Sequence, residues 1–100
     1  MKNKVNITYI NLGGIGISAK SGSLKRHKTY NLQLKDKTIE ISLKVQIIGI
    51  SRKDYNGDRE YRAVYRDLID SQLTAIKQIE ATFAPESLTA KITIKESKNE

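Results

Sequence analysis

A chain of 100 residues, 38% hydrophobic and 29% charged, has room for one domain with a modest core and is too apolar to be disordered throughout. It contains no cysteine, which excludes disulfides and thiolate chemistry. No apolar stretch approaches the roughly 20 residues of a membrane-spanning helix, and the first residues lack the apolar core of a secretory signal. We therefore expect one soluble, cytoplasmic domain over residues 1–100, with no segment inserted into a membrane.

The formal net charge of +7 is concentrated at the start of the chain. Residues 1–35 contain seven basic side chains and no acid, whereas residues 36–100 contain 11 of each sign. A contiguous excess of cations favours a polyanionic partner, but lysine-rich surfaces also serve solubility alone. Both interpretations stay open at this point.

Alternation of apolar and polar side chains predicts five strands before residue 68. Their apolar members, expected on one inner face, are Val5, Ile7 and Tyr9; Ile15, Ile17 and Ala19; Tyr30, Leu32 and Leu34; Ile39, Ile41, Leu43, Val45 and Ile47; and Tyr61, Ala63 and Tyr65. Turn residues at 11–14, 35–37 and 54–58 and a longer loop at 21–27 separate the strands, and Asn56-Gly57 is a strong hairpin signal. The alternation slips at Gly49, which indicates a bulge.

After Asp67 the apolar period changes to three and four residues, which predicts a helix. Its apolar positions are Ile69, Leu73, Ile76, Ile79 and Phe83. We expect Asp70 or Ser71 to cap the first turn and Pro85 to end the helix. Alternation then returns over residues 88–95 and predicts a sixth strand.

One helix cannot cover a sheet of six strands, so the sheet must curl and bury its own inner face. The predicted fold is therefore mainly β: a small six-stranded antiparallel barrel with one flanking C-terminal helix over one opening. We expect the strand at residues 88–95 to close the barrel from the far end of the chain, because open strand edges invite aggregation.

The sequence offers little for catalysis or for metal binding. The sole histidine, His27, lies among cations at residues 25–28 with no carboxylate close in sequence to orient it. With no cysteine, a metal site would depend on carboxylates, and these are scattered among basic side chains. We expect no enzyme activity, no cofactor and no metal.

The sharpest local feature is the glycine cluster Asn-Leu-Gly-Gly-Ile-Gly at residues 11–16. Glycines permit positive φ and leave backbone N–H groups uncovered, a geometry that can hold a phosphate. The cluster is not a dinucleotide fingerprint, because it joins two predicted strands and no helix follows. A tight or bulged turn with no ligand is the competing interpretation.

Residues 9–17, Tyr-Ile-Asn-Leu-Gly-Gly-Ile-Gly-Ile, resemble the second motif of a PilZ domain, Asp/Asn-x-Ser-x-x-Gly between two strands. The best register places Tyr9 at the acidic position, Asn11 at the serine and Gly14 at the glycine. A register with Asn11 first, Gly13 at the serine and Gly16 last displaces the Gly-Gly pair. Looser resemblance extends to about Phe83, and residues 82–84 are similar to the helix end of the PilZ domain attached to bacterial cellulose synthases.

The resemblance implies a six-stranded barrel with a flanking helix and a regulatory role in bacterial cyclic di-GMP signalling, acting on exopolysaccharide, motility or adhesion machinery. In that family an upstream Arg-x-x-x-Arg motif grips the nucleotide, and the residues before Tyr9 contain no arginine. Lysine lacks arginine's planar fork, so we expect weak or absent nucleotide binding and action through an unidentified protein partner. Any remaining nucleotide affinity is placed at Tyr9, Asn11, Gly13 and Gly14.

Three alternatives stay open: a true cyclic di-GMP receptor, a domain that oligomerises through exposed strand edges, and a small barrel that binds single-stranded nucleic acid. The last would stack bases on tyrosines and hold phosphates with arginines, here Tyr30, Tyr55, Tyr61 and Tyr65 with Arg59, Arg62 and Arg66. Tyr61 and Tyr65 share the face of Ala63, which favours core positions and makes nucleic acid the less favoured partner.

Overall fold

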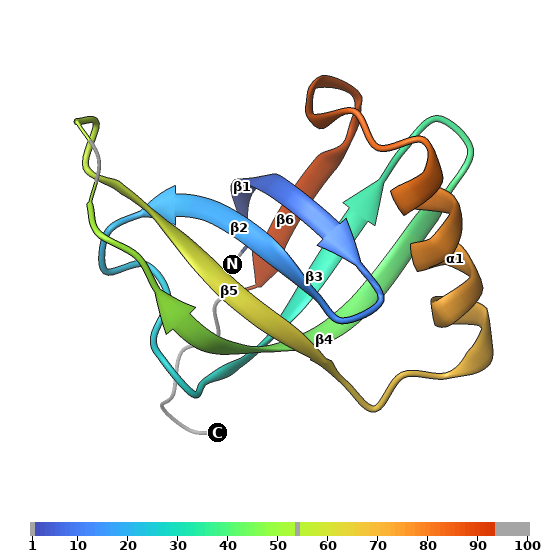
Figure 1. Ribbon diagram of the computed structural model, residues 1–100, viewed down its shortest axis with the longest axis horizontal. Coiled ribbons are helices and arrows are strands. Elements are labelled where there is room, and N and C mark those ends of the chain that lie inside the picture. The colour runs from blue at the N-terminus through green and yellow to red at the C-terminus, as the bar shows by residue number, and fades with distance from the viewer. Residues whose placement is uncertain (1, 54, 94–100) are drawn as a thin grey trace.

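The computed structural model describes residues 2–53 and 55–93 and confirms the predicted class, a closed antiparallel barrel of six strands with one helix (Figure 1). The strands are β1 (Lys2–Asn11), β2 (Gly14–Lys20), β3 (Thr29–Lys35), β4 (Glu40–Ile50), β5 (Asp58–Arg66) and β6 (Thr89–Thr93). Helix α1 covers Asp70–Ala81, and a short 3₁₀ turn, η1, covers Pro85–Ser87. No helix in these described ranges is long and apolar enough to cross a bilayer.

The last strand closes the barrel, as predicted. The strand order is β1-β2-β5-β4-β3-β6, and β6 pairs antiparallel with both β3 and β1, so that Ala90 lies opposite Leu34 on one side and Val5 on the other. Residues 94 and 95 of the predicted strand lie outside the described residues. Since every strand pairs with two neighbours, the described barrel has no edge strand, and this counts against the alternative of oligomerisation by edge pairing.

The inner face of the barrel is apolar, and no polar or charged side chain of the described residues is buried. Its buried positions confirm most of the predicted alternation: Val5, Ile7, Ile10, Ile15, Ile17, Tyr30, Leu32, Leu34, Leu43, Val45, Ile47, Tyr61, Ala63, Ala90 and Ile92. Five predicted inner residues are only partly buried, namely Tyr9, Ala19, Ile39, Ile41 and Tyr65. Four of them lie near strand ends, where the inner face opens.

Two bulges set which residues face the core. The predicted slip is confirmed, because the β4–β5 pairing shifts between Ile47 and Gly49. A second shift, in β1 between Ile7 and Tyr9, has no signal in the alternation. It turns Ile10 into the core, at 5% exposure, and leaves Tyr9 outside. The predicted inward position of Tyr9 is therefore wrong, since one extra residue in a strand reverses the faces that follow it.

Helix α1 lies at one end of the barrel against β1 and β4 (Figure 1). Ile76 and Ile79 are buried in the core. The N-cap residue is Ile69 rather than Asp70 or Ser71, so the predicted cap is wrong. Gln72 binds the cap residue from within the helix: its Oε1 accepts the Ile69 N–H at 2.9 Å while its Nε2 donates to the Ser42 carbonyl at 2.9 Å. The start of the helix is thereby tied to β4.

Candidate binding groove beside the glycine turn

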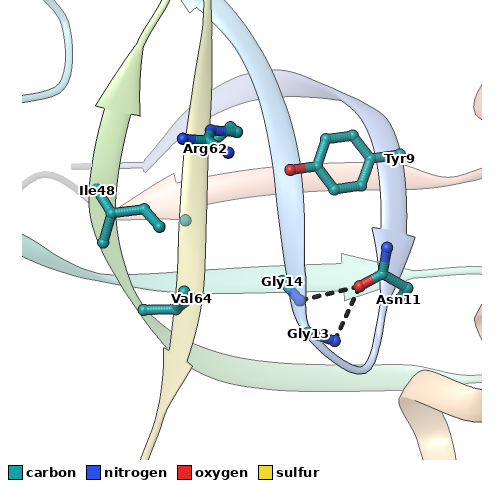
Figure 2. Close-up of a pocket in the computed structure, with 8 residues that line it drawn as sticks. Tyr9, Asn11, Gly13, Gly14, Ile48, Arg62 and Val64 are labelled. Atoms are coloured by element: carbon teal, nitrogen blue, oxygen red, sulfur yellow. Dashed lines mark hydrogen bonds between the residues drawn. The ribbon is translucent and has the colours of Figure 1, made fainter.

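The four residues predicted as a nucleotide site lie together on the outer surface of the barrel (Figure 2). One side of a hollow of about 270 Å³ is lined by Tyr9 and Asn11 at the end of β1, Gly13 in the turn and Gly14 at the start of β2. The other side comes from β4 and β5, which contribute Ile48, Arg62, Ala63 and Val64. The structure thus assembles the predicted residues and adds a second wall.

The backbone amides of the glycine turn are already occupied. The Asn11 Oδ1 accepts the N–H of Gly13 at 2.8 Å and that of Gly14 at 3.1 Å, as the dashed lines in Figure 2 show. This side-chain turn satisfies both donors. Neither glycine has a positive φ. The Gly13 and Gly14 amides are therefore not the uncovered donors that the sequence predicted, and this geometry fits the competing interpretation as a tight turn.

Glycine is needed here because other atoms come close. A Cβ on Gly14 would lie 2.7 Å from the Ala63 carbonyl oxygen on β5, and a Cβ on Gly16 would lie 2.5 Å from the Tyr9 ring. Tyr9 and Gly16 are partners in the β1–β2 pairing, so the ring covers the glycine from the outside. The two glycines let β2 pack closely against the neighbouring backbone and ring.

Tyr65 holds the turn from the β5 side. Its hydroxyl lies 2.7 Å from the Asn11 carbonyl oxygen and 3.1 Å from that of Gly14, and it donates to this pair. Burial, followed by the charge of Glu80 and the neighbouring Tyr9, raises the pKa of Tyr65 well above its ordinary value. The hydroxyl therefore stays protonated, and remains a donor, throughout the physiological range.

Arg62 crosses the outer surface from β5 and lies over the β4 bulge. Its Nε and Nη2 atoms are 3.2 and 3.3 Å from the position of a Cβ on Gly49. Within the described part of the chain, its guanidinium has no hydrogen bond or ion pair. A planar cation without a partner is suited to bind a carboxylate or a phosphate.

A second hollow, of about 360 Å³, lies on the other side of Arg62. It shares Ile48 and Arg62 with the first hollow, and its remaining lining is Arg26, Gly49, Ile50, Ser51 and Glu60. The Glu60 carboxylate is engaged elsewhere, because its Oε2 accepts the Thr8 hydroxyl at 2.6 Å. We call the two hollows together the Arg62 groove.

The alternation correctly places Arg62 and Val64 on the outer face of their strand, but it does not predict that they border the glycine turn. That proximity follows from the β2–β5 pairing, in which Gly16 lies opposite Arg62. Nothing in the local sequence specifies this partnership. The Gly49 bulge is the one available signal, because it marks where a neighbouring side chain lies close to the β4 backbone.

The predicted stacking surface for nucleic acid is not present. Tyr30 and Tyr61 are buried, with 7% and 0% of their surface exposed, and the hydroxyl of Tyr65 is bound to the glycine turn. Of the four tyrosines, only Tyr55 is exposed. Arg59 is likewise engaged, donating to the Ser21 hydroxyl at 2.9 Å and to the Ser51 carbonyl at 2.8 Å. These residues cannot act together as a base-stacking platform.

No protein-family model matches the chain, and no curated protein and no solved structure was found to match it.

Proposed function

We propose that this chain is a non-enzymatic, PilZ-like regulatory domain that contacts a protein partner through the Arg62 groove and binds cyclic di-GMP weakly or not at all. Its setting in this proposal is bacterial, cytoplasmic cyclic di-GMP signalling that controls exopolysaccharide such as cellulose, motility or adhesion. The motif resemblance at residues 9–17 supports the proposal, as does a six-stranded barrel with a flanking helix.

The observation that carries the proposal is the pair of hydrogen bonds from the Gly13 and Gly14 amides to Asn11 Oδ1. A nucleotide phosphate could use these amides only by displacing the Asn11 side chain. Each bond lost in that exchange costs about 1 kcal/mol. Tyr9 carries no carboxylate to accept from a guanine edge, and the residues before it contain no arginine.

The remaining features of the groove suit a protein contact. Ile48 is 41% exposed and lies beside the half-buried Val64 and the unpaired guanidinium of Arg62. Apolar contact around an arginine is typical of the centre of a protein interface. The first hollow of the groove, about 270 Å³, is smaller than ordinary ligand sites of roughly 300–1,000 Å³, and the second, about 360 Å³, lies near the lower limit of that range, so each hollow by itself suits a protein side chain.

Titration calorimetry with cyclic di-GMP tests the nucleotide part of the proposal. We expect no binding heat at ligand concentrations up to roughly 100 μM; a Kd near 1 μM, about −8 kcal/mol, would contradict it. A photo-reactive cross-linker at Ile48 tests the partner, and a cross-linker at the exposed Lys91 on the outer face of β6 serves as control. A partner captured from both positions alike would show that the groove is not the contact.

A true cyclic di-GMP receptor is the second candidate. It is favoured by the convergence of Tyr9, Asn11, Gly13 and Gly14 with Arg62 in one hollow. In this case Arg62 takes the place of an upstream arginine, so Arg62→Ala abolishes the calorimetric signal while Lys91→Ala leaves it unchanged. Binding that survives Arg62→Ala counts against this site.

A further inference from the structure

A separate cation-rich surface lies at the end of the barrel away from α1, where the β2–β3 and β4–β5 loops project (Figure 1). We call it the loop end; its five cations, all exposed, are Lys25, Arg26, Lys28, Arg52 and Lys53. Among the described residues the ion pairs are Lys20–Asp58 and Lys44–Asp67, so none of the five cations is neutralised by a carboxylate there. Arg26 also borders the Arg62 groove.

Hydrogen bonds hold the two loops together. The Ser21 N–H donates to the Gly57 carbonyl at 2.9 Å, and Arg59 links Ser21 to Ser51. Two buried tyrosines anchor the first loop from below. The Tyr30 hydroxyl accepts the Lys25 N–H at 3.0 Å, and the Tyr61 hydroxyl accepts the Gly22 N–H at 3.2 Å. These bonds hold the bases of the two loops next to each other, so both loops present their cations at the same end of the barrel.

The β4–β5 loop adds one exposed aromatic ring to this charged surface. Tyr55 is fully exposed, two and three positions after Lys53 and Arg52. Asp54 lies outside the described residues. Asp58, at the base of the loop, is partly buried and pairs with Lys20 at 3.9 Å.

We propose that the loop end docks on an anionic lipid surface without any segment entering the hydrocarbon core. Lysine and arginine near a negatively charged leaflet are attracted by its surface potential, and tyrosine is enriched at headgroup level. Cations from two separate loops can act on one extended layer of headgroups at the same time. A single-stranded nucleic acid fits less well, because the described residues of the loop end supply one exposed ring and no stacking platform.

Co-sedimentation of the whole chain with vesicles tests this proposal. We expect binding to phosphatidylcholine vesicles that contain about 30% phosphatidylglycerol and none to phosphatidylcholine alone. Binding should be lost when NaCl rises from about 0.1 M to about 1 M, because the Debye length falls from about 10 Å to about 3 Å. No binding to the anionic vesicles, or binding that persists at high salt, overturns the proposal.

Two charge-matched variants separate the loop end from the net charge of the protein. Lys25→Glu with Lys53→Glu alters the loop end, whereas Lys37→Glu with Lys77→Glu alters two other exposed lysines, one in the β3–β4 loop and one on α1. Both lower the formal net charge from +7 to +3. Each cation lost from the contact is worth about fivefold in vesicle affinity, and each new carboxylate adds repulsion, so we expect binding at least about 25-fold weaker for the first variant and a much smaller change for the second. Equal losses overturn the proposal.

Two further measurements complete the test. An oligothymidylate that binds the chain more tightly than the anionic vesicles, with the same loss in the loop-end variant, assigns the surface to nucleic acid and overturns the lipid proposal. Ile48→Ala removes the exposed apolar side chain of the Arg62 groove without adding charge beside Arg26, so it should leave vesicle binding intact and keeps this test independent of the proposed function. Unchanged circular dichroism of each variant confirms that it folds.

Discussion

The Tyr65 hydroxyl lies 2.7 Å from the Asn11 carbonyl oxygen and joins two residues 54 positions apart in the chain. Through this contact β5 supports the β1–β2 turn, whose amides are in turn held by the Asn11 side chain. The turn is therefore fixed from two directions, and the amides of Gly13 and Gly14 are occupied within it.

Tyr65→Phe should lower the free energy of unfolding by about 1–2 kcal/mol, because the ring still packs while two carbonyls lose a shared donor. Urea denaturation followed by circular dichroism measures the change. Tyr55→Phe removes a hydroxyl from a fully exposed ring and is the control, with an expected change below about 0.5 kcal/mol. Equal effects of the two substitutions would show that the Tyr65 contact does not stabilise the turn.

The raised pKa of Tyr65 predicts a loss of stability in alkali. Below the ordinary tyrosine pKa of about 10 the hydroxyl is protonated in both states and its contribution is complete. Above it, the unfolded chain releases the proton while the folded chain keeps it, so the free energy of unfolding falls by up to about 1.4 kcal/mol per pH unit from this group. The difference in the free energy of unfolding between the wild type and Tyr65→Phe should therefore shrink between about pH 10 and pH 12. A difference that stays constant over this range would contradict the raised pKa of Tyr65.

Asn11→Ala should destabilise the domain by about 1–2 kcal/mol, because the Gly13 and Gly14 amides lose their acceptor. Asn11→Asp keeps both acceptor positions and is the matched comparison, with stability close to that of the wild type. Amide hydrogen exchange gives a local readout: the two glycine amides should exchange faster in Asn11→Ala only. If they exchange equally fast in all three proteins, the side-chain turn does not persist in solution.

Gly14→Ala should cost about 1–3 kcal/mol, because its Cβ would meet the Ala63 carbonyl 2.7 Å away and the β2–β5 backbones must separate. Gly13→Ala, one position earlier, is the control: its Cβ would meet only the Asn11 Oδ1, at 3.3 Å. Thermal denaturation of both variants distinguishes them. If Gly13→Ala lowers the melting temperature more than Gly14→Ala does, the close contact between Gly14 and Ala63 does not limit the packing of β2 on β5.

Much of the fold was predictable because it depends on local periodicity. Residues that alternate every second position must point to one side of a strand, and fully buried strand residues such as Ile17, Leu32 and Ile47 follow that rule. The Gly49 slip and the change of period after Asp67 were visible for the same reason. The β1 bulge was not, since Ile7, Tyr9 and Ile10 are compatible with either face.

Only one of the two walls of the candidate site was predictable from the sequence. Its first wall is a contiguous stretch of sequence, so a motif could point to Tyr9, Asn11, Gly13 and Gly14. The roles of those residues and the opposite wall depend on contacts between distant strands. Arg62 has no local feature that separates it from Arg66, and only the register of β5 against β2 places it beside the turn.

By itself, the sequence determined that this chain forms a curled antiparallel sheet with an apolar inner face, because the side-chain period of a strand is written into every few residues. Only the tertiary structure decided that the glycine turn holds its own amides and that Arg62 crosses an open groove beside it. Strand order and register are collective properties of the closed barrel, and no short segment encodes them.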